Sequence, residues 1–234
     1  MDLRGTQRRT MNAVRAAAIL GLLLGIRVSA WGVPVIGQFD WNAPNDLEGW
    51  ASAQSWVHLS NPNSGGIGNT GYLNISLDPT APFPGEQWSA LATVDAQSLF
   101  AGNWGPSMAV DFQFWAEDVV PGAVQVQWQG SSGHIWRYTL TGPSATHTWT
   151  EMTAPFSNWQ NWVFPGATEE MYLSDLASID WIGIYVYRNT SSGQSYGLDD
   201  FRLLIPEPEQ YALLAAVGIV ILLAVRRRRR SPVS

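Results

Sequence analysis

Short segments in which apolar and polar residues alternate run through the middle of the chain, and none of them carries a long apolar repeat of helical period. The clearest spans Met108–Trp115, where Val110, Phe112 and Phe114 share one side. Successive side chains of a β-strand point to opposite faces, so this segment predicts a half-buried strand. The other segments that we expect to form strands are Gln38–Trp41, Gln54–Leu59, Tyr72–Leu77, Trp88–Val94, Val124–Gln129, Ile135–Leu140, His147–Thr153, Ile179–Tyr187 and Tyr196–Ile205.

Glycine, proline, asparagine and serine separate these segments, as is typical of turns. About ten short strands at regular spacing predict an all-β fold, a two-sheet antiparallel β-sandwich. We favour a jelly roll, because the first and last strands would then lie side by side. Helix is expected only as single turns at Asp95–Gly102 and Ser174–Ser178, and Ala154–Gly166 is expected to be a long loop.

The N-terminus breaks this pattern. An apolar run, Ala16–Ile26, is followed by the small residues Val28-Ser29-Ala30. Its preceding basic residues are Arg4, Arg8, Arg9 and Arg15. This layout predicts a secretory signal peptide helix over residues 1–30, cut after Ala30 by signal peptidase. A signal anchor that is never cut is the alternative, and in both cases the secretion machinery exports the middle of the chain.

The C-terminal segment, residues 205–234, has three parts: an extended neck with two prolines, the uncharged run Tyr211–Val225, and a block of arginines. As a helix the run would be about 22 Å long at about 1.5 Å per residue. That is shorter than the hydrocarbon core of about 30 Å, yet we expect it to be a transmembrane helix. The arginines hold its end in the cytoplasm by the positive-inside rule; they are Arg226, Arg227, Arg228, Arg229 and Arg230.

This segment resembles the PEP-CTERM sorting signal of Gram-negative bacteria. The matching residues are Pro206, Glu207 and Pro208, then Tyr211-Ala212-Leu213-Leu214, the apolar run and the arginines. Glu209-Gln210 stands where family members often have small hydroxyl residues. The resemblance implies recognition by an exosortase, a membrane-embedded transpeptidase or protease of cysteine type. It also implies cleavage near the motif and delivery to the envelope or to an extracellular polysaccharide matrix. A plain tail anchor is the alternative.

Charge narrows the function of the middle domain, residues 31–204. The chain contains no cysteine, which excludes disulfides and thiolate chemistry. The middle domain has no lysine and only three arginines, Arg137, Arg188 and Arg202, against sixteen acidic residues. So acidic a domain repels phosphate backbones, which argues against nucleic-acid binding. All thirteen tryptophans fall between Trp31 and Trp181, and tryptophan stacks well on sugar rings because it is flat and apolar with one donor.

The two ends of this domain, taken together, resemble galactose-binding-like jelly rolls, above all carbohydrate-binding modules. The matching stretches are Phe39-Asp40, Asp46-Leu47-Glu48-Gly49-Trp50 and Tyr196-Gly197-Leu198-Asp199-Asp200-Phe201-Arg202-Leu203. The resemblance implies a structural calcium where the first and last strands meet, with Asp40 and Asp199 as ligands and Asp200 as a third candidate. Calcium takes six to eight oxygens, including backbone carbonyls and waters. The alternative is that Asp199 accepts hydrogen bonds from backbone donors and no ion binds.

Aromatic residues that escape the core are the candidates for glycan binding. Trp159 and Trp162 are our first choice, because they lie in a loop and strand alternation does not direct them inward. The other candidates are Trp128 with Gln125 and Gln127, Trp136 with Tyr138, and Tyr185 with Tyr187. Trp128 shares its face with Val124 and Val126, so we expect it in the core, and Trp136 and Tyr138 could be core residues too.

A glycan-active enzyme is the least favoured hypothesis. The adjacent acid pairs are Glu117-Asp118, Glu169-Glu170 and Asp199-Asp200, and neighbours on a strand point to opposite faces. The histidines His58, His134 and His147 have no metal-ligand spacing, and no serine lies in a Gly-x-Ser-x-Gly motif. We therefore expect no enzyme and no required cofactor, and the structural calcium stays one of two alternatives.

We expect an exported protein of a Gram-negative bacterium that passes through the inner membrane to the cell envelope, the surface or the extracellular matrix. Before processing it is held in the membrane by its C-terminal helix. The middle domain is expected to bind extracellular polysaccharide. The alternative is a non-catalytic structural role in the matrix, without a discrete ligand site.

Overall fold

The structure, a computed structural model, describes residues 35–52, 54–79, 89–95, 100, 103–105, 107, 109–187, 190 and 192–205. The predicted signal peptide, the sorting motif, the transmembrane helix and the arginine block lie outside these residues, as does most of the helical turn expected at Asp95–Gly102. None of the helices within the described residues has the length and apolar character that a membrane span requires.

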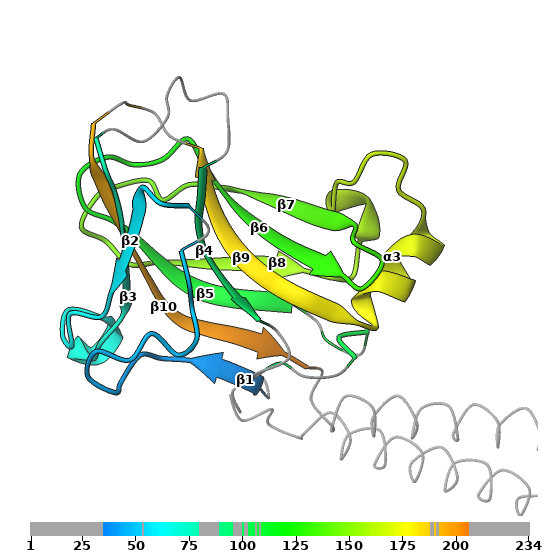
Figure 1. Cartoon of the computed structure of the whole chain (residues 1–234), viewed down its shortest axis with the longest axis horizontal. Coiled ribbons are helices and arrows are strands. Elements are labelled where there is room, and N and C mark those ends of the chain that lie inside the picture. Colours follow the sequence, from blue (N-terminus) through cyan, green and yellow to red (C-terminus); the bar gives the residue numbers. More distant parts are fainter. Residues whose placement is uncertain are drawn as a thin grey trace, which may run out of the picture. The chain divides into compact units, whose positions relative to one another are not determined.

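Within the described residues, ten strands form two antiparallel sheets that pack face to face, as the alternation predicts (Figure 1). Sheet A runs in the order β2 (Val57–Ser60), β3 (Leu73–Leu77), β10 (Gln194–Leu204), β5 (Ala109–Ala116) and β8 (Thr150–Pro155), and β1 (Val35–Phe39) also pairs with β10. Sheet B runs in the order β4 (Ser89–Asp95), β9 (Ile179–Tyr187), β6 (Ala123–Gly130) and β7 (Ile135–Thr141).

The last strand, β10, closes the sandwich. Along one edge it pairs with β5, and along the other it pairs first with β3 and then with β1. The expected side-by-side arrangement of the first and last strands is confirmed, with Phe39 opposite Phe201 (Figure 1). The change of partner coincides with a bulge between Asp199 and Arg202, where Asp200 has a left-handed φ of 48°.

This bulge determines which side chains of β10 reach the core. Tyr196 and Leu198 point inward before it, and Phe201 and Leu203 point inward after it. Leu198 and Phe201 are three positions apart, so in a regular strand they would lie on opposite faces and Phe201 would point to the solvent. The extra residue of the bulge restores the inward direction.

Aromatic rings fill the space between the sheets. Trp128 and Trp136, on β6 and β7, stack with centroids 5.8 Å apart and are fully buried, so the expectation that Trp128 is a core residue is confirmed. Around Phe201, the rings of Phe39, Trp50 and Phe112 lie with centroids 5.1 to 6.3 Å away. Burial of such large apolar surfaces is the main favourable term in folding.

Two predicted strands are displaced, each next to a residue with a left-handed backbone. The first strand ends at Phe39 rather than Trp41, where φ is 46°, and β8 begins at Thr150 rather than His147, where φ is 56°. Non-glycine residues seldom adopt this conformation, and regular strand pairing cannot continue through it without a bulge. Nothing in the hydrophobic pattern marks either residue as left-handed.

The helical turn expected at Ser174–Ser178 is wrong in its bounds. The helix α3 spans Glu169–Leu176, and Thr168 caps it by accepting a hydrogen bond from the backbone N–H of Met171 at 3.2 Å. Glu169 and Glu170 occupy the first turn, where their negative charges interact favourably with the positive end of the helix dipole. Threonine followed by two glutamates was a start signal in the sequence. Two 3₁₀ turns, η1 (Ile67–Asn69) and η2 (Trp159–Asn161), complete the described helices.

Candidate functional site

The outer face of sheet B carries a row of glutamines. Val124, Val126 and Trp128 of β6 point into the core, so the residues between them point outward. The pairing register places Gln125 between Thr139 and Tyr185, Gln127 between Arg137 and Gly183, and Gln129 between Ile135 and Trp181. We call this surface the glutamine face; it comprises Gln125, Gln127, Gln129, Arg137, Trp181 and Tyr185.

Hydrogen bonds hold the amides of this face in place. Gln125 donates to the Thr139 hydroxyl at 3.0 Å and accepts from Gln127, while Gln129 donates to the Gly133 carbonyl at 2.8 Å. The Trp181 indole N–H donates to Gln129 Oε1 at 2.7 Å. Gln125 and Gln127 are only 4% and 5% exposed although they point away from the core. The face is therefore ordered in advance of any ligand.

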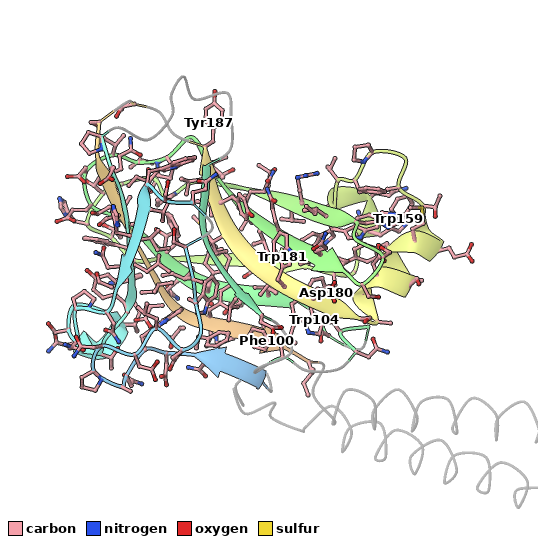
Figure 2. All side chains as sticks on the ribbon, viewed as in Figure 1. Phe100, Trp104, Trp159, Asp180, Trp181 and Tyr187 are labelled. Atoms are coloured by element: carbon pink, nitrogen blue, oxygen red, sulfur yellow. The ribbon has the colours of Figure 1, made fainter. Side chains whose placement is uncertain are left out.

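The aromatic residues of the glutamine face lie outside the hydrophobic core. Trp181 and Tyr185 are half-buried, and neither belongs to the core cluster or to the apolar side chains packed against it. Both come from β9, on either side of Gly183, which has no side chain. Figure 2 shows Trp181 and Tyr187 at different points along this strand. Half-buried ring surface outside the core is suited to stacking against the apolar face of a ligand.

Arg137 brings a positive charge to this face. Burial raises the pKa of the Tyr185 hydroxyl, and the Arg137 guanidinium opposes that rise, so the two groups are close enough to interact. Arg137 also donates to the Ile135 carbonyl at 3.5 Å, and its backbone pairs with Val163. Guanidinium, amide and phenol together offer donors and acceptors next to the aromatic rings, which is the chemistry that polyhydroxylated rings require.

The loop pair Trp159 and Trp162 is not a pair of exposed rings. Trp162 is 1% exposed, donates its indole N–H to the Pro155 carbonyl at 2.9 Å, and stacks on Phe156 with centroids 5.4 Å apart. The expectation that Trp162 is available at the surface is wrong, because a loop can fold over the open edge of a sandwich and fill it. Trp159 is half-buried in η2, beside α3 (Figure 2), and its role as a binding residue stays a prediction.

Sequence reasoning missed Trp181 and Arg137 and only partly identified this surface. Gln125, Gln127 and Tyr185 were candidates, but the glutamines were grouped with Trp128, which lies on the opposite face. The signal was present: along Ile179–Tyr187 the apolar residues Ile182, Ile184 and Val186 alternate with the others, which places Trp181 and Tyr185 on the opposite face. What alternation could not supply was the register that sets β9 beside β6.

The expected calcium ligands lie near one another at the bulge of β10. Asp199 is 1% exposed, and its carboxylate accepts from the backbone N–H groups of Ile67 at 2.7 Å and Asp200 at 2.8 Å. Burial is the main reason that the pKa of Asp199 is raised to about 6. The two backbone hydrogen bonds lower this pKa, and the nearby charges of Asp200 and Asp40 raise it further.

Asp40 and Asp200 have partners of their own. Asp40 accepts from the backbone N–H of Asn42 at 3.3 Å, and Asp200 accepts from the Gln38 amide at 3.2 Å. In the part of the chain that the structure describes, no three side chains of Asp, Glu, His or Cys gather closely enough to hold a metal ion. The described side chains thus match backbone capping by Asp199 better than a calcium nucleus, and calcium stays a prediction.

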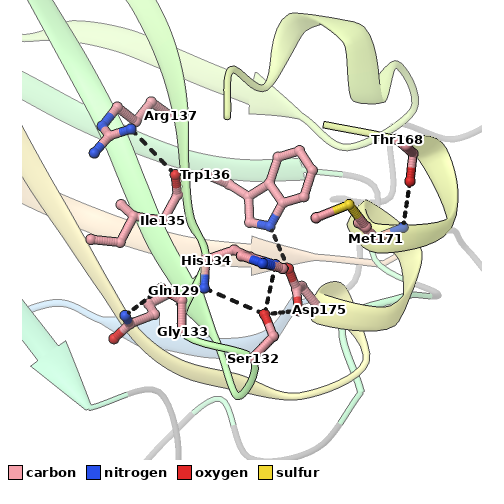
Figure 3. Close-up of polar contacts among 10 residues, drawn as sticks. All are labelled: Gln129, Ser132, Gly133, His134, Ile135, Trp136, Arg137, Thr168, Met171 and Asp175. Atoms are coloured by element: carbon pink, nitrogen blue, oxygen red, sulfur yellow. Dashed lines mark hydrogen bonds and ion pairs between the residues drawn. The ribbon is translucent and has the colours of Figure 1, made fainter. Parts of the chain in front are cut away.

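A second polar cluster joins α3 to the hairpin between β6 and β7 (Figure 3). Asp175 of α3 accepts from the Trp136 indole at 2.9 Å and from the Ser132 hydroxyl, and its carboxylate lies 2.8 Å from His134 Nδ1. Ser132 Oγ lies 2.8 Å from the same ring nitrogen. A catalytic triad places its carboxylate and its nucleophile on opposite ring nitrogens, so this cluster lacks that geometry.

Comparisons with known proteins show which solved structures have a similar fold. No protein-family model matches the sequence, and no curated protein matches it. Among solved structures, the carbohydrate-binding module CtCBM11 superposes with a TM-score of 0.51 at 17% identity, over 76% of this chain and 99% of that chain.

Two enzymes contain a similar domain. An exo-β-agarase gives a TM-score of 0.53 at 12% identity, over 74% of this chain. The CBM22-1–GH10 modules of Clostridium thermocellum xylanase 10B, solved with xylohexaose, give 0.52 at 9% identity, also over 74% of this chain. The match spans 25% of the agarase and 29% of the xylanase structure. The described domain is thus a two-sheet β-sandwich like those of carbohydrate-binding module jelly rolls.

Replacing Asp175 by Asn should lower the free energy of unfolding at neutral pH by about 1–3 kcal/mol, because the buried Trp136 and Ser132 donors lose a charged acceptor. Burial alone would raise the pKa of Asp175, but hydrogen bonds from Ser132, Trp136 and His134 outweigh it, so the pKa falls below 3.8. A lowered pKa stabilises the folded state above pH 3.8, and this stabilisation is lost as the carboxyl protonates at lower pH.

Urea unfolding of the full-length chain, followed by tryptophan fluorescence, would measure this difference. It should shrink below pH 4, the usual range of aspartate titration. Asp180→Asn, at an exposed position of β9, is the matched control and should leave stability unchanged. A D175N cost that is absent at neutral pH, or that persists unchanged in acid, would contradict this account.

Asp199 should have the opposite pH dependence. Its raised pKa means that the charged carboxylate is disfavoured in the folded state above pH 6, and that protonation relieves this cost as the pH falls toward 3.8. The stability of the wild type relative to Asp199→Asn should therefore fall by about 1–3 kcal/mol as the pH rises from about 4 to about 7.

The same measurement with Ca²⁺ on the order of 1 mM separates the two interpretations of Asp199. A bound cation would raise the melting temperature of the wild type but not of D199N, and would remove the pH dependence. Stability that does not respond to Ca²⁺ would leave Asp199 as a backbone cap. A wild-type-to-variant difference that stays constant with pH would refute the raised pKa itself.

Proposed function

We propose that the middle domain is a carbohydrate-binding module that holds a polysaccharide on the glutamine face. The observation that carries the proposal is the position of Trp181 and Tyr185, half-buried outside the core, beside a row of ordered amides. Similarity to CtCBM11 and to part of the CBM22-1–GH10 modules solved with xylohexaose supports it. A binding domain needs no catalytic group, so we propose no enzymatic activity.

Each residue of the face has a part in this proposal. Trp181 and Tyr185 stack on the apolar faces of pyranose rings, and Arg137 bonds the ring hydroxyls. The buried Gln127 supports this surface by donating to Gln125. Because Trp181 is held by Gln129 at 2.7 Å, little side-chain entropy is lost when a sugar binds. The ligand is an extracellular polysaccharide.

Replacing Trp181 by Ala should weaken binding to a soluble polysaccharide about tenfold, because one stacking surface is removed. The measurement is affinity electrophoresis of the full-length chain against xylan and the exopolysaccharide of the producing strain. The chain is kept in a detergent without a sugar headgroup, which would otherwise compete. Trp181→Phe keeps a ring and should retain most of the affinity.

Trp159→Ala is the matched comparison, since it removes a half-buried tryptophan from the loop. Loss of binding in W159A with full binding in W181A would transfer the site to the loop, as the sequence pattern suggested. Binding of the wild type to no polysaccharide would favour the structural-matrix alternative.

We also propose that residues 205–234 direct the protein to the envelope or the extracellular matrix through an exosortase. Signal peptidase would act first, and the membrane would hold the unprocessed chain only transiently. The order of Pro206-Glu207-Pro208, the apolar run and the arginines supports this proposal, as does a domain suited to extracellular polymers.

Glu207→Ala in the producing bacterium should leave the chain unprocessed in the inner membrane, detected by immunoblot as a larger species absent from the matrix fraction. Glu209→Ala alters an acid two positions away and should be processed like the wild type. Equal processing of both variants would indicate a plain tail anchor.

A further inference from the structure

A second group of aromatic rings lies on the outer face of sheet A, on the other side of the sandwich from the glutamine face. Trp149 precedes β8, Tyr72 precedes β3, and Trp115 belongs to β5. The centroids of Trp149 and Trp115 are 6.2 Å apart with their planes at 28°, and Tyr72 lies 5.4 Å from Trp149. All three are half-buried and outside the core cluster. We call them the aromatic patch.

Gly197 of β10 lies beneath the rings of this patch and leaves room for them. A Cβ at that position would lie 2.7 Å from Cη2 of Trp149 and 3.1 Å from Cδ2 of Tyr72, so both rings approach the strand more closely than any other residue would allow. The Trp149 indole also donates to the Gly65 carbonyl at 3.1 Å. The rings are therefore fixed against the sheet rather than free to turn.

Neutral polar side chains border the patch on the same face. Asn74, which pairs with Gly197, donates to the Ser60 hydroxyl at 3.2 Å, and the hydroxyls of Ser76 and Ser195 lie 3.0 Å apart. Apolar ring surface next to hydroxyl and amide groups matches a pyranose, which has C–H groups on its faces and hydroxyls around its rim.

Charge decides which pyranose the patch would accept. Glu117 is close enough to add to the rise in pKa that burial gives Tyr72. Arg202, the one described arginine of sheet A, forms an ion pair with Asp111 and is not available to an anion. A sugar with carboxylate or sulfate groups would be repelled here, whereas a neutral one would not.

We propose that the aromatic patch is a second glycan-binding site, for the pyranose units of a neutral polysaccharide. Its binding does not depend on the glutamine face. If both faces bind, which rests on the proposed function, one molecule engages two polymer strands on opposite sides and cross-links them.

Trp149→Leu tests this site because leucine keeps apolar volume without an aromatic ring. Titration calorimetry of the full-length chain would use hexasaccharides of xylose, glucose, galactose and mannose, with oligogalacturonate as the anionic probe. The wild type should bind two neutral oligosaccharides per chain, and W149L and W181A should each bind one. Trp149→Phe should keep both sites. Oligogalacturonate should not bind at the aromatic patch.

Gly197→Ala is a second test that leaves all the rings in place. Its methyl group pushes the far end of the Trp149 ring off the strand, which should weaken the second site about tenfold without unfolding the sheet. Light scattering from a long neutral polysaccharide should rise with the wild type and not with W149L or W181A, because either change leaves a single site.

The outcomes separate the two sites. Unchanged stoichiometry and scattering in W149L and G197A would overturn the second site while leaving the glutamine face intact. If W149L loses all binding while W181A binds like the wild type, the aromatic patch is established and the glutamine face is refuted. A change of sedimentation coefficient in W149L without sugar would mark the patch as a contact between copies and overturn the proposal. No heat with any oligosaccharide would overturn both sites.

Discussion

The structure depends on the backbone pairing of its last strand. β10 lies between β5 on one side and β3 and β1 on the other, so the sheet is incomplete until the end of the domain is in place. Its bulge at Asp199 and Asp200 keeps both Leu198 and Phe201 directed inward. A regular strand would expose one end of β10 to water, and the ring cluster around Phe201 would lose its centre.

The same alternation that builds the core also leaves rings outside it. Once Val124, Val126 and Trp128 fill the interior, their neighbours on β6 must face outward, and the register adds Trp181 and Tyr185 beside them. On sheet A, Gly197 provides the space that Trp149 and Tyr72 occupy. Tryptophan therefore has two physical roles here: it packs the interior where two sheets meet, and it lies half-buried where only one sheet supports it.

Much of the fold could be predicted because it follows from period-two alternation. The bounds of β9 and the inward direction of Phe112 and Phe114 follow from local pattern alone. The strand ends next to Trp41 and His147 could not be predicted, since the left-handed backbones of these residues are imposed by their surroundings. The candidate site was only partly predictable, because it depends on which strands are neighbours. The prediction that Trp162 is exposed was wrong because a loop residue is not bound by strand alternation and can still pack into the core, where Trp162 is buried.

Val35 pairs with Leu204, so the chain enters and leaves the sandwich side by side. This antiparallel arrangement makes the domain mechanically anisotropic. Tension applied between its two chain ends would open the β1–β10 ladder one residue pair at a time, which needs little force. Tension between the C-terminal end and a load held on a sheet face would instead pull β10 lengthwise past β3 and β5, straining all of their hydrogen bonds together. The domain is thus weak when it is peeled and strong when it is sheared.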